Sequence, residues 1–332
     1  MHKLLISSLI FLSLVISPFA QAGIEDKVAV QQFISKMVDQ HQFESVVLVK
    51  LFQSVEIKPN IIETMTKPAE GMPWHKYRKI FMRDSRIQGG VKFWQLNQAS
   101  LEIAAQRYDV PEEIIVAIMG VETSYGEHTG GHRVIDALST LAFDYPKRSQ
   151  FFLSELEQFL LLCREEKMNP LEPVGSYAGA MGMPQFMPSS YRHYAADFEG
   201  DMRRDIWHNP ADAIASVANY FSRHKWQAGQ DIAFPVQVNG AEYKKMLTMS
   251  QDLKPDMTVK QLLSAGVQVP EELDQQTHVK LLSFEQENGD EVWAGLENFY
   301  VISRYNHSPL YAMAVYQLSA EIKQQYRAAN HE

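Results

Sequence analysis

The sequence predicts a mainly α-helical protein of the α+β class, with a helical N-terminal part and a small insert that contains β-strands. Two patterns predict this class. Apolar residues recur at helical spacing over most of the chain between residues 30 and 221, and again after residue 298. Residues 278–285 alternate instead, and 287–290 (Glu-Asn-Gly-Asp) have the composition of a tight turn between strands. With 332 residues, 45% of them hydrophobic and 21% charged, the chain resembles a globular protein of about two domains.

The N-terminus has the pattern of an export signal. Lys3 precedes an apolar run at 4–16, and Ala20 and Ala22 form a small-x-small cleavage site before Gly23. A transmembrane helix needs about 20 residues, and this apolar run is shorter. No cysteine follows it to carry a lipid anchor. We therefore expect a signal peptide, cleavage between Ala22 and Gly23, and a soluble periplasmic protein without a transmembrane segment.

The elements after the signal peptide are predicted in chain order from the same spacing. Val30, Phe33 and Met37 indicate a helical N-terminal part. Further helices are predicted at 91–108, 112–121, 136–143, 149–166, 211–221 and 298–328, and strands at 232–238, 278–285 and 291–296. The predicted segments are a signal peptide at 1–22, a helical N-terminal part at 23–75, a helical core at 76–229, a small β insert at 230–298 and a C-terminal segment at 299–332.

Apolar residues almost surround the helix predicted at 112–121, which is typical of a helix buried at the centre of a protein. Asp109 is expected to cap its start, because Pro111 is tolerated in a first helical turn and Glu112 can reach back to the cap. The helix is expected to stop near Thr123.

Charge and cysteine content exclude several classes of protein. The formal net charge is −9, so the chain as a whole lacks the basic footprint of a nucleic-acid binder. Its single cysteine, Cys163, cannot form an internal disulfide or a Cys-rich zinc site, and its apolar surroundings favour a buried helix residue over a nucleophile. The G-x-S-x-G motif of many serine hydrolases is absent.

Glu122 ends the central apolar helix and is the candidate catalytic residue. Burial disfavours its carboxylate, and so does the negative end of the helix dipole, so both raise its pKa. A glutamic acid that stays protonated near neutral pH suits a general acid acting on a glycosidic oxygen. Spacing alone leaves open a second interpretation, in which Glu122 points into solvent from a frayed helix end.

Residues 175–190 form a stretch rich in glycine and methionine. Its small residues open space for an extended ligand, to which Ser176 and Gln185 can hydrogen-bond. The alternative is a tight turn followed by a helix that starts at Pro188. The stretch is not a phosphate-binding loop, because no Gly-Lys-Ser/Thr follows the glycines.

Residues 197–208 resemble a calcium-binding loop, with Asp197, Asp201 and Asp205 as weak candidate ligands. Met202 stands where the sharp turn requires glycine, and His208 where a carboxylate is required. The sequence therefore favours a loop of acidic and basic residues joined by ion pairs over a calcium site.

The last cluster, residues 298–308 followed by Tyr311, combines aromatic rings with amides. Rings stack on sugar faces, and amides bind hydroxyl and N-acetyl groups. The alternative is a polar loop that caps a helix beginning at Pro309.

Taken together, these segments resemble the lytic murein transglycosylase B family. The motifs that carry the resemblance occur in order at 120–126, 143–148, 179–190, 215–221 and 298–311, with a further match at 68–78. The likeness covers about residues 25–325. It implies a lysozyme-like helical catalytic core at 76–229, and a lyase that cleaves the β-1,4 bond between N-acetylmuramic acid and N-acetylglucosamine in peptidoglycan during cell-wall turnover.

The resemblance also implies roles for individual residues. Glu122 stands at the family's catalytic acid/base position. Residues on positions that line the glycan cleft are Ser176, Gln185, Tyr220, Tyr305, Asn306 and Tyr311. Lys147 and Arg148 match a basic pair that would meet the acidic peptide stems. No cofactor is implied as required, although some members carry calcium in the loop that corresponds to 197–208.

The implied mechanism uses one carboxyl group instead of the two of ordinary glycosidases. Glu122 protonates the leaving oxygen and then, as a carboxylate, takes the proton of the muramoyl C6 hydroxyl, which closes a 1,6-anhydro ring. Two other functions stay open at this point: a hydrolytic muramidase on the same fold, and a catalytically silent peptidoglycan-binding protein. Expected partners are peptidoglycan glycan strands and other cell-wall enzymes, but not nucleic acid.

Overall fold

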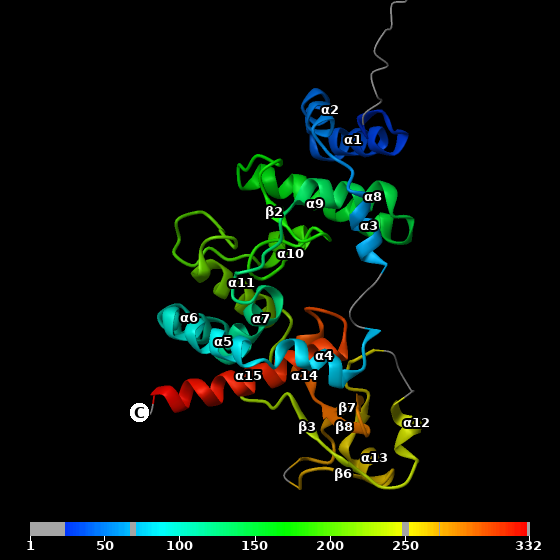
Figure 1. Ribbon diagram of the computed structural model, residues 1–332, viewed down its shortest axis with the longest axis vertical. Coiled ribbons are helices and arrows are strands. Elements are labelled where there is room, and N and C mark those ends of the chain that lie inside the picture. Colours follow the sequence, from blue (N-terminus) through cyan, green and yellow to red (C-terminus); the bar gives the residue numbers. More distant parts are fainter. Residues whose placement is uncertain (1–23, 67–70, 248–251, 272, 331–332) are drawn as a thin grey trace, which may run out of the picture. The chain divides into compact units, whose positions relative to one another are not determined.

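The computed structural model describes residues 24–66, 71–247, 252–271 and 273–330 (Figure 1). The chain divides into two units, of which the first ends at Ser54 and the second begins at Val55. The predicted signal peptide lies outside the described residues. Within the described ranges, no helix combines the length and the apolar character needed to cross a membrane.

The first unit contains the short 3-10 helix η1 (Ile24–Asp26) and the helices α1 (Val28–His41) and α2 (Ser45–Gln53). Phe33 of α1 meets Phe52 of α2 edge to face, with ring centroids 6.0 Å apart. Gln42 ends α1 in the left-handed conformation, and its N–H bonds the last carbonyls of the helix. The helical N-terminal pattern is thus confirmed in this unit.

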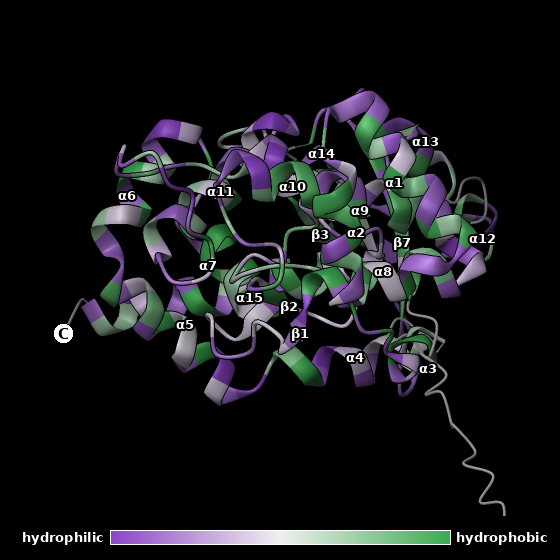
Figure 2. Ribbon diagram, turned by 90° about the horizontal axis from the view of Figure 1, so that it is seen from above, coloured by the Kyte–Doolittle hydropathy of each residue, from purple (hydrophilic) through white to green (hydrophobic). Residues whose placement is uncertain are grey.

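The second unit is built around α7 (Glu112–Thr123), which is buried from Ile114 to Gly120 and coloured as hydrophobic along much of its length in Figure 2. Four helices pack near it: α5 (Asp84–Leu96), α6 (Gln98–Tyr108), α11 (Pro210–Arg223) and α15 (Pro309–Asn330). Outside the β insert, the other described helices of this unit are α3 (Pro59–Met65), α4 (Trp74–Phe81), α8 (Val134–Asp144), η3 (Pro146–Arg148), α9 (Ser149–Glu165), α10 (Pro188–Tyr194) and α14 (Glu297–Ser303).

Two local predictions in this region are wrong. The single helix predicted at 91–108 is divided between α5 and α6 at Asn97, whose side-chain amide donates to the Phe93 carbonyl at 2.8 Å and so competes with the backbone ladder. Asp109 does not cap α7. It adopts the left-handed conformation that ends α6 (φ 56°), and Pro111 takes the N-cap position of α7.

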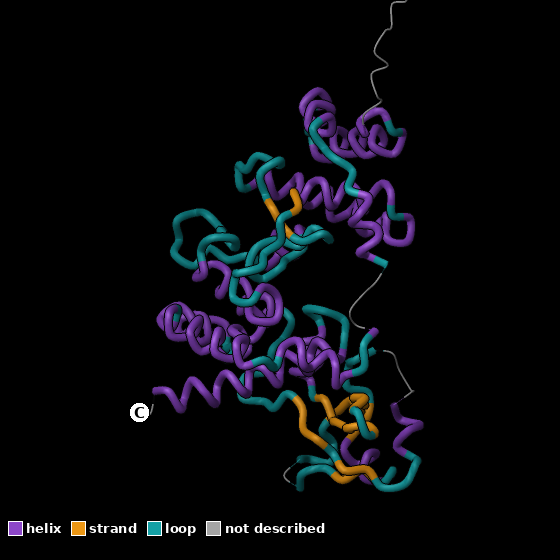
Figure 3. The backbone as a smooth tube through the Cα atoms, viewed as in Figure 1, coloured by secondary structure: helices purple, strands orange, loops and turns teal. Residues whose placement is uncertain are grey.

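The predicted β insert contains a four-stranded antiparallel sheet in the order β3-β8-β7-β5 (Figure 3). Its central hairpin joins β7 (His278–Gln286) to β8 (Gly289–Gly295) through the predicted turn, with Gln286 opposite Gly289. Val279, Leu281 and Val292 lie in its core. The remaining elements are β3 (Ala233–Pro235), β4 (Gln237–Val238), α12 (Tyr243–Leu247), β5 (Met257–Thr258), α13 (Val259–Ser264) and β6 (Val267–Gln268).

The C-terminal region predicted as one helix at 298–328 consists of α14 and α15, separated by residues 304–308. Tyr305 and Asn306 lie in this separating segment. In a continuous helix their side chains would point in other directions. Cys163 lies buried in α9, as expected, and burial raises the pKa of its thiol to about 12.

Candidate active site

Glu122 stands in the last turn of α7, where part of the residue reaches solvent while protein atoms surround its carboxyl group. The Tyr311 hydroxyl donates a hydrogen bond to Oε1 of Glu122 at 2.6 Å. Burial raises the pKa of Glu122 to about 7, and the Tyr311 hydrogen bond partly opposes this rise because it favours the carboxylate. Glu122 is therefore not a solvated residue at a frayed helix end. It is an acid that can hold and release a proton near neutral pH.

Tyr311 belongs to a cluster of three tyrosines from separate elements that extends away from this carboxyl group. The ring of Tyr311 is nearly parallel to that of Tyr305, with centroids 6.4 Å apart. The centroid of the Tyr305 ring lies 4.7 Å from that of Tyr220. The Tyr305 hydroxyl donates to the Pro184 carbonyl at 2.6 Å, and the Tyr220 hydroxyl donates to the Arg304 carbonyl at 2.5 Å. These bonds join α11, the 304–308 segment, α15 and the glycine-rich loop into one site.

The glycine-rich loop is fastened directly to the end of α7. Thr123, the neighbour of Glu122, donates its hydroxyl to the Met183 carbonyl at 2.9 Å. Gln185 has a left-handed backbone (φ 51°), and its side-chain amide donates to the Gly182 carbonyl at 2.8 Å and the Thr129 carbonyl at 3.2 Å. Ser176 accepts hydrogen bonds from the N–H groups of Ala178 and Ala180, so its oxygen helps to shape the loop.

The glycines of this loop have a packing reason that the sequence interpretation missed. A Cβ atom at Gly175 would lie 2.2 Å from the Ala180 carbonyl oxygen. At Gly182, which has a positive φ of 66°, it would lie 2.6 Å from the Ile206 carbonyl oxygen. Backbone approaches this close allow only glycine. Gly175 therefore lets the loop fold on itself, and Gly182 lets it pack against the backbone at Ile206.

The three remaining residues that the resemblance places in contact with substrate are Lys147, Arg148 and Asn306. Lys147 and Arg148 are exposed on η3, and the Arg148 guanidinium carbon lies 4.2 Å above the centroid of the Phe151 ring. Within the described ranges, neither forms a hydrogen bond or ion pair with Glu122, so their role stays a prediction. Asn306 is half-buried, and its carbonyl accepts the Ser308 N–H at 2.7 Å.

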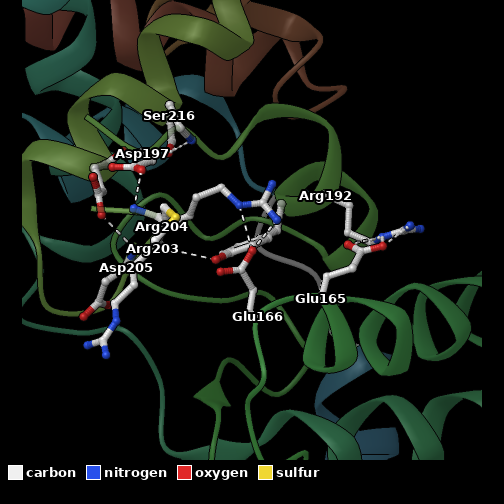
Figure 4. Close-up of polar contacts among 12 residues, drawn as sticks. Glu165, Glu166, Arg192, Asp197, Arg203, Arg204, Asp205 and Ser216 are labelled. Carbon is white, nitrogen blue, oxygen red and sulfur yellow. Dashed lines mark hydrogen bonds and ion pairs between the residues drawn. The ribbon is translucent and has the colours of Figure 1, made fainter. Parts of the chain in front are cut away.

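The loop at 197–208 uses its carboxylates internally. Asp197 accepts the N–H groups of Gly200, Asp201 and Met202, and Asp205 accepts those of Trp207 and His208. Arg204 of the loop pairs with Glu166, which lies outside the loop, and the His208 ring nitrogen Nδ1 lies 3.3 Å from Oδ2 of Asp205. The ion pairs predicted within the loop are therefore present only in part. Figure 4 shows Arg204 reaching Glu166 beside the pair between Arg192 and Glu165. In the described part of the chain, no group of three or more His, Cys, Asp or Glu residues could hold a metal ion.

Comparison with known proteins identifies the family of the chain that carries this site. The family description "Transglycosylase SLT domain" matches residues 25–320. The membrane-bound lytic murein transglycosylase B of Escherichia coli K12 is 42% identical over 302 residues, which are 88% of this chain and 82% of that protein. The chain belongs to the lytic murein transglycosylase B family.

Solved structures of other lytic transglycosylases agree with this assignment. The catenated lytic transglycosylase SltB1 of Pseudomonas aeruginosa is 46% identical, with a TM-score of 0.86 over 91% of this chain and 99% of that one. Escherichia coli Slt35, solved in complex with calcium, is 41% identical, with a TM-score of 0.81 over 91% and 94%. The fold class predicted for this lytic transglycosylase, mainly helical and lysozyme-like, is confirmed.

Proposed function

We propose that this lytic transglycosylase cleaves the β-1,4 bond between N-acetylmuramic acid and N-acetylglucosamine in peptidoglycan, with Glu122 as its single acid and base. The observation that carries the proposal is a glutamic acid whose pKa burial raises to about 7, placed among three tyrosines in a chain of this family. Cleavage of a glycosidic bond at neutral pH requires a group that still holds a proton to give to the leaving oxygen.

The proposed reaction has two steps that conserve atoms and charge. Protonated Glu122 gives its proton to the glycosidic oxygen, the bond from that oxygen to the muramoyl anomeric carbon breaks, and the N-acetylglucosamine part leaves with a new hydroxyl. The muramoyl N-acetyl carbonyl assists at the anomeric carbon. The Glu122 carboxylate then takes the proton of the C6 hydroxyl, whose oxygen bonds to the anomeric carbon. Water does not enter, so no second carboxylate is needed to activate it.

We assign the surrounding residues to the glycan and its peptide stems. We assign Tyr220, Tyr305 and Tyr311 to the wall of the glycan cleft: their rings form one cluster, in which Tyr311 bonds the Glu122 carboxyl group, Tyr305 is half-buried and the other two are almost wholly buried. Ser176, Gln185 and Asn306 would hydrogen-bond sugar substituents. Lys147 and Arg148 are exposed cations suited to the acidic stems. In this scheme the core at 76–229 and the segment at 299–332 form the cleft.

We further propose that the protein works in the periplasm, after residues 1–22 are removed as a signal peptide. An exported location supports this activity, because the substrate is a polymer of the cell wall. Other cell-wall enzymes are proposed partners on the same ground.

Analysis of the products tests the reaction. Purified peptidoglycan digested with the protein is expected to give muropeptides with 1,6-anhydromuramoyl ends, detected by mass spectrometry as products that lack one water relative to hydrolysed ones. Reducing muramoyl ends would identify a muramidase instead. If no soluble products form while the protein still sediments with peptidoglycan, the chain is a binding protein.

The pH dependence of cleavage is expected to follow the protonation of Glu122. Because the pKa of Glu122 is about 7, turnover should be high below this pH and fall as the pH rises through it. The variant Tyr311→Phe removes a hydrogen bond that favours the carboxylate, so the pKa of Glu122 rises and the alkaline limb moves to higher pH. Initial rates between pH 5 and 9 measure both curves. A limb that moves to lower pH in this variant would contradict the assignment.

A further inference from the structure

The chain leaves α7 by an unusual path directly after Glu122. Ser124 and Tyr125 both adopt the left-handed conformation, with φ of 53° and 64°, and Gly126 follows with φ of 93°. A side chain makes this conformation unfavourable, and two such residues in succession persist only where the surroundings hold them. The structure must therefore contain groups that fix this turn.

The ring of Tyr125 fits between α5 and α7 because three glycines make room for it. A Cβ atom at Gly120 would lie 2.6 Å from the Tyr125 hydroxyl oxygen, one at Gly90 2.7 Å from the same atom, and one at Gly89 2.8 Å from the ring edge. Phe93 stacks on the other part of the ring, with centroids 5.7 Å apart. The side chain of Tyr125 is thus held on several sides, although its backbone is strained.

Hydrogen bonds close this arrangement into a ring of contacts with Arg86. The Tyr125 hydroxyl donates to the Arg86 carbonyl at 2.7 Å. The half-buried Arg86 guanidinium donates in turn to the carbonyl of Gly120, which also accepts the Ser124 N–H at 3.1 Å. Gly120 lies two residues before Glu122. Arg86 therefore places a cation on one of the last carbonyls of α7, where the helix dipole is negative.

We propose that Arg86 and Tyr125 are positioning residues for proton transfer, which hold the last turn of α7 so that Glu122 points its carboxyl group at the scissile bond. This inference rests on the role proposed for Glu122. We call the two residues the Arg86–Tyr125 clamp.

Glu122 needs such support because it lies near the end of α7. Only Thr123 follows Glu122 within α7, and the last turn of a helix frays easily because its carbonyls lack intrahelical partners. A displacement of about 1 Å at a reacting group can cost about 100-fold in rate. Tyr311 holds the carboxyl group from the side of α15, while the clamp fixes the backbone that carries it.

Tyr125→Phe and Tyr191→Phe form a matched pair that tests the clamp. Tyr191 also donates its hydroxyl to an arginine carbonyl, that of Arg204 at 2.6 Å, and burial raises the pKa of both phenols. Each variant loses one such hydrogen bond and keeps its ring. With purified peptidoglycan as substrate, Tyr125→Phe is expected to lower kcat about 10-fold with KM unchanged. Tyr191→Phe should lose comparable thermal stability and keep the kcat of the wild type.

A second pair separates the charge of Arg86 from its packing. Arg86→Met removes the donor to the Gly120 carbonyl and is expected to lower kcat more than Tyr125→Phe does. Arg86→Lys keeps a cationic donor and should recover part of the loss. Equal kcat values for Tyr125→Phe, Tyr191→Phe and the wild type would overturn the inference, and so would a lysine variant no better than the methionine variant.

These outcomes are distinguishable from failure of the proposed function. If Glu122→Gln retains turnover, the role of Glu122 is wrong, and the clamp has nothing to position. If Glu122→Gln is inactive while Tyr125→Phe matches its Tyr191 control, only the clamp is wrong.

Discussion

Replacing Glu122 by glutamine is expected to lower the turnover of peptidoglycan at least about 10³-fold, because a general acid or base contributes about 10²–10⁴-fold and Glu122 acts in both steps. Glutamine has the same shape and can still accept the Tyr311 hydrogen bond, so the fold should persist. Release of soluble anhydromuropeptides from purified peptidoglycan measures the loss, and retained release would remove Glu122 from the mechanism.

The control for this variant is Glu113→Gln, which makes the same chemical change in the first turn of the same helix. Glu113 pairs with Lys323 of α15 at 2.5 Å. This pair is far along α7 from Glu122, so its loss should lower stability slightly and leave turnover near that of the wild type. An equal loss in both variants would indicate damage to α7 in place of lost proton transfer.

The same Glu122→Gln variant is expected to become more stable than the wild type as the pH rises. In the folded protein the pKa of Glu122 is about 7, whereas the ordinary value is 4.5. Below pH 4.5 both states hold the proton, and the carboxyl group makes no difference. Between these values the unfolded chain releases its proton first, so folding stability falls as the pH rises. At about 1.4 kcal/mol per pKa unit, the loss reaches about 3 kcal/mol above pH 7.

Denaturant unfolding of both proteins at several pH values between 4.5 and 8 measures this difference. The two free energies of unfolding should be similar at pH 4.5 and separate by about 3 kcal/mol, in favour of the variant, at pH 8. Parallel curves over this range would show that the pKa of Glu122 is not raised. Together with the lost turnover, the expected result would show that the buried Glu122 carboxyl group, which cleavage requires, also lowers the folding stability.

The sequence predicts α7 and its burial well, because a helix that is apolar on all sides is stable only in the interior of a protein. It predicts the hairpin of β7 and β8 for a similarly local reason, since alternation and turn residues lie within 20 positions or so of each other. The division at Asn97 is harder to predict, because helical spacing continues across it and only a side chain that competes for the backbone ends the helix. The division at 304–308 has a local signal in Pro309, where the alternative interpretation of this cluster begins a helix and where α15 does begin.

The candidate site shows the same limit more sharply. The position of Glu122 at the end of an apolar helix predicts the direction of its pKa, and the structure agrees. Its partner Tyr311 lies 189 residues further along the chain, and no local pattern joins the two. Thr123, Arg86 and Tyr125 were missed because their hydroxyl and guanidinium groups act on backbone carbonyls, which carry no sequence signal.

The single cysteine has a practical consequence for labelling. Cys163 is buried in α9, and a thiol with a pKa of about 12 is almost wholly protonated at neutral pH, so it should resist alkylation by maleimides. A cysteine introduced at an exposed position would then be the reactive thiol of the chain, without prior removal of the native one. Fluorophores or spin labels could report in this way on glycan strands entering the site.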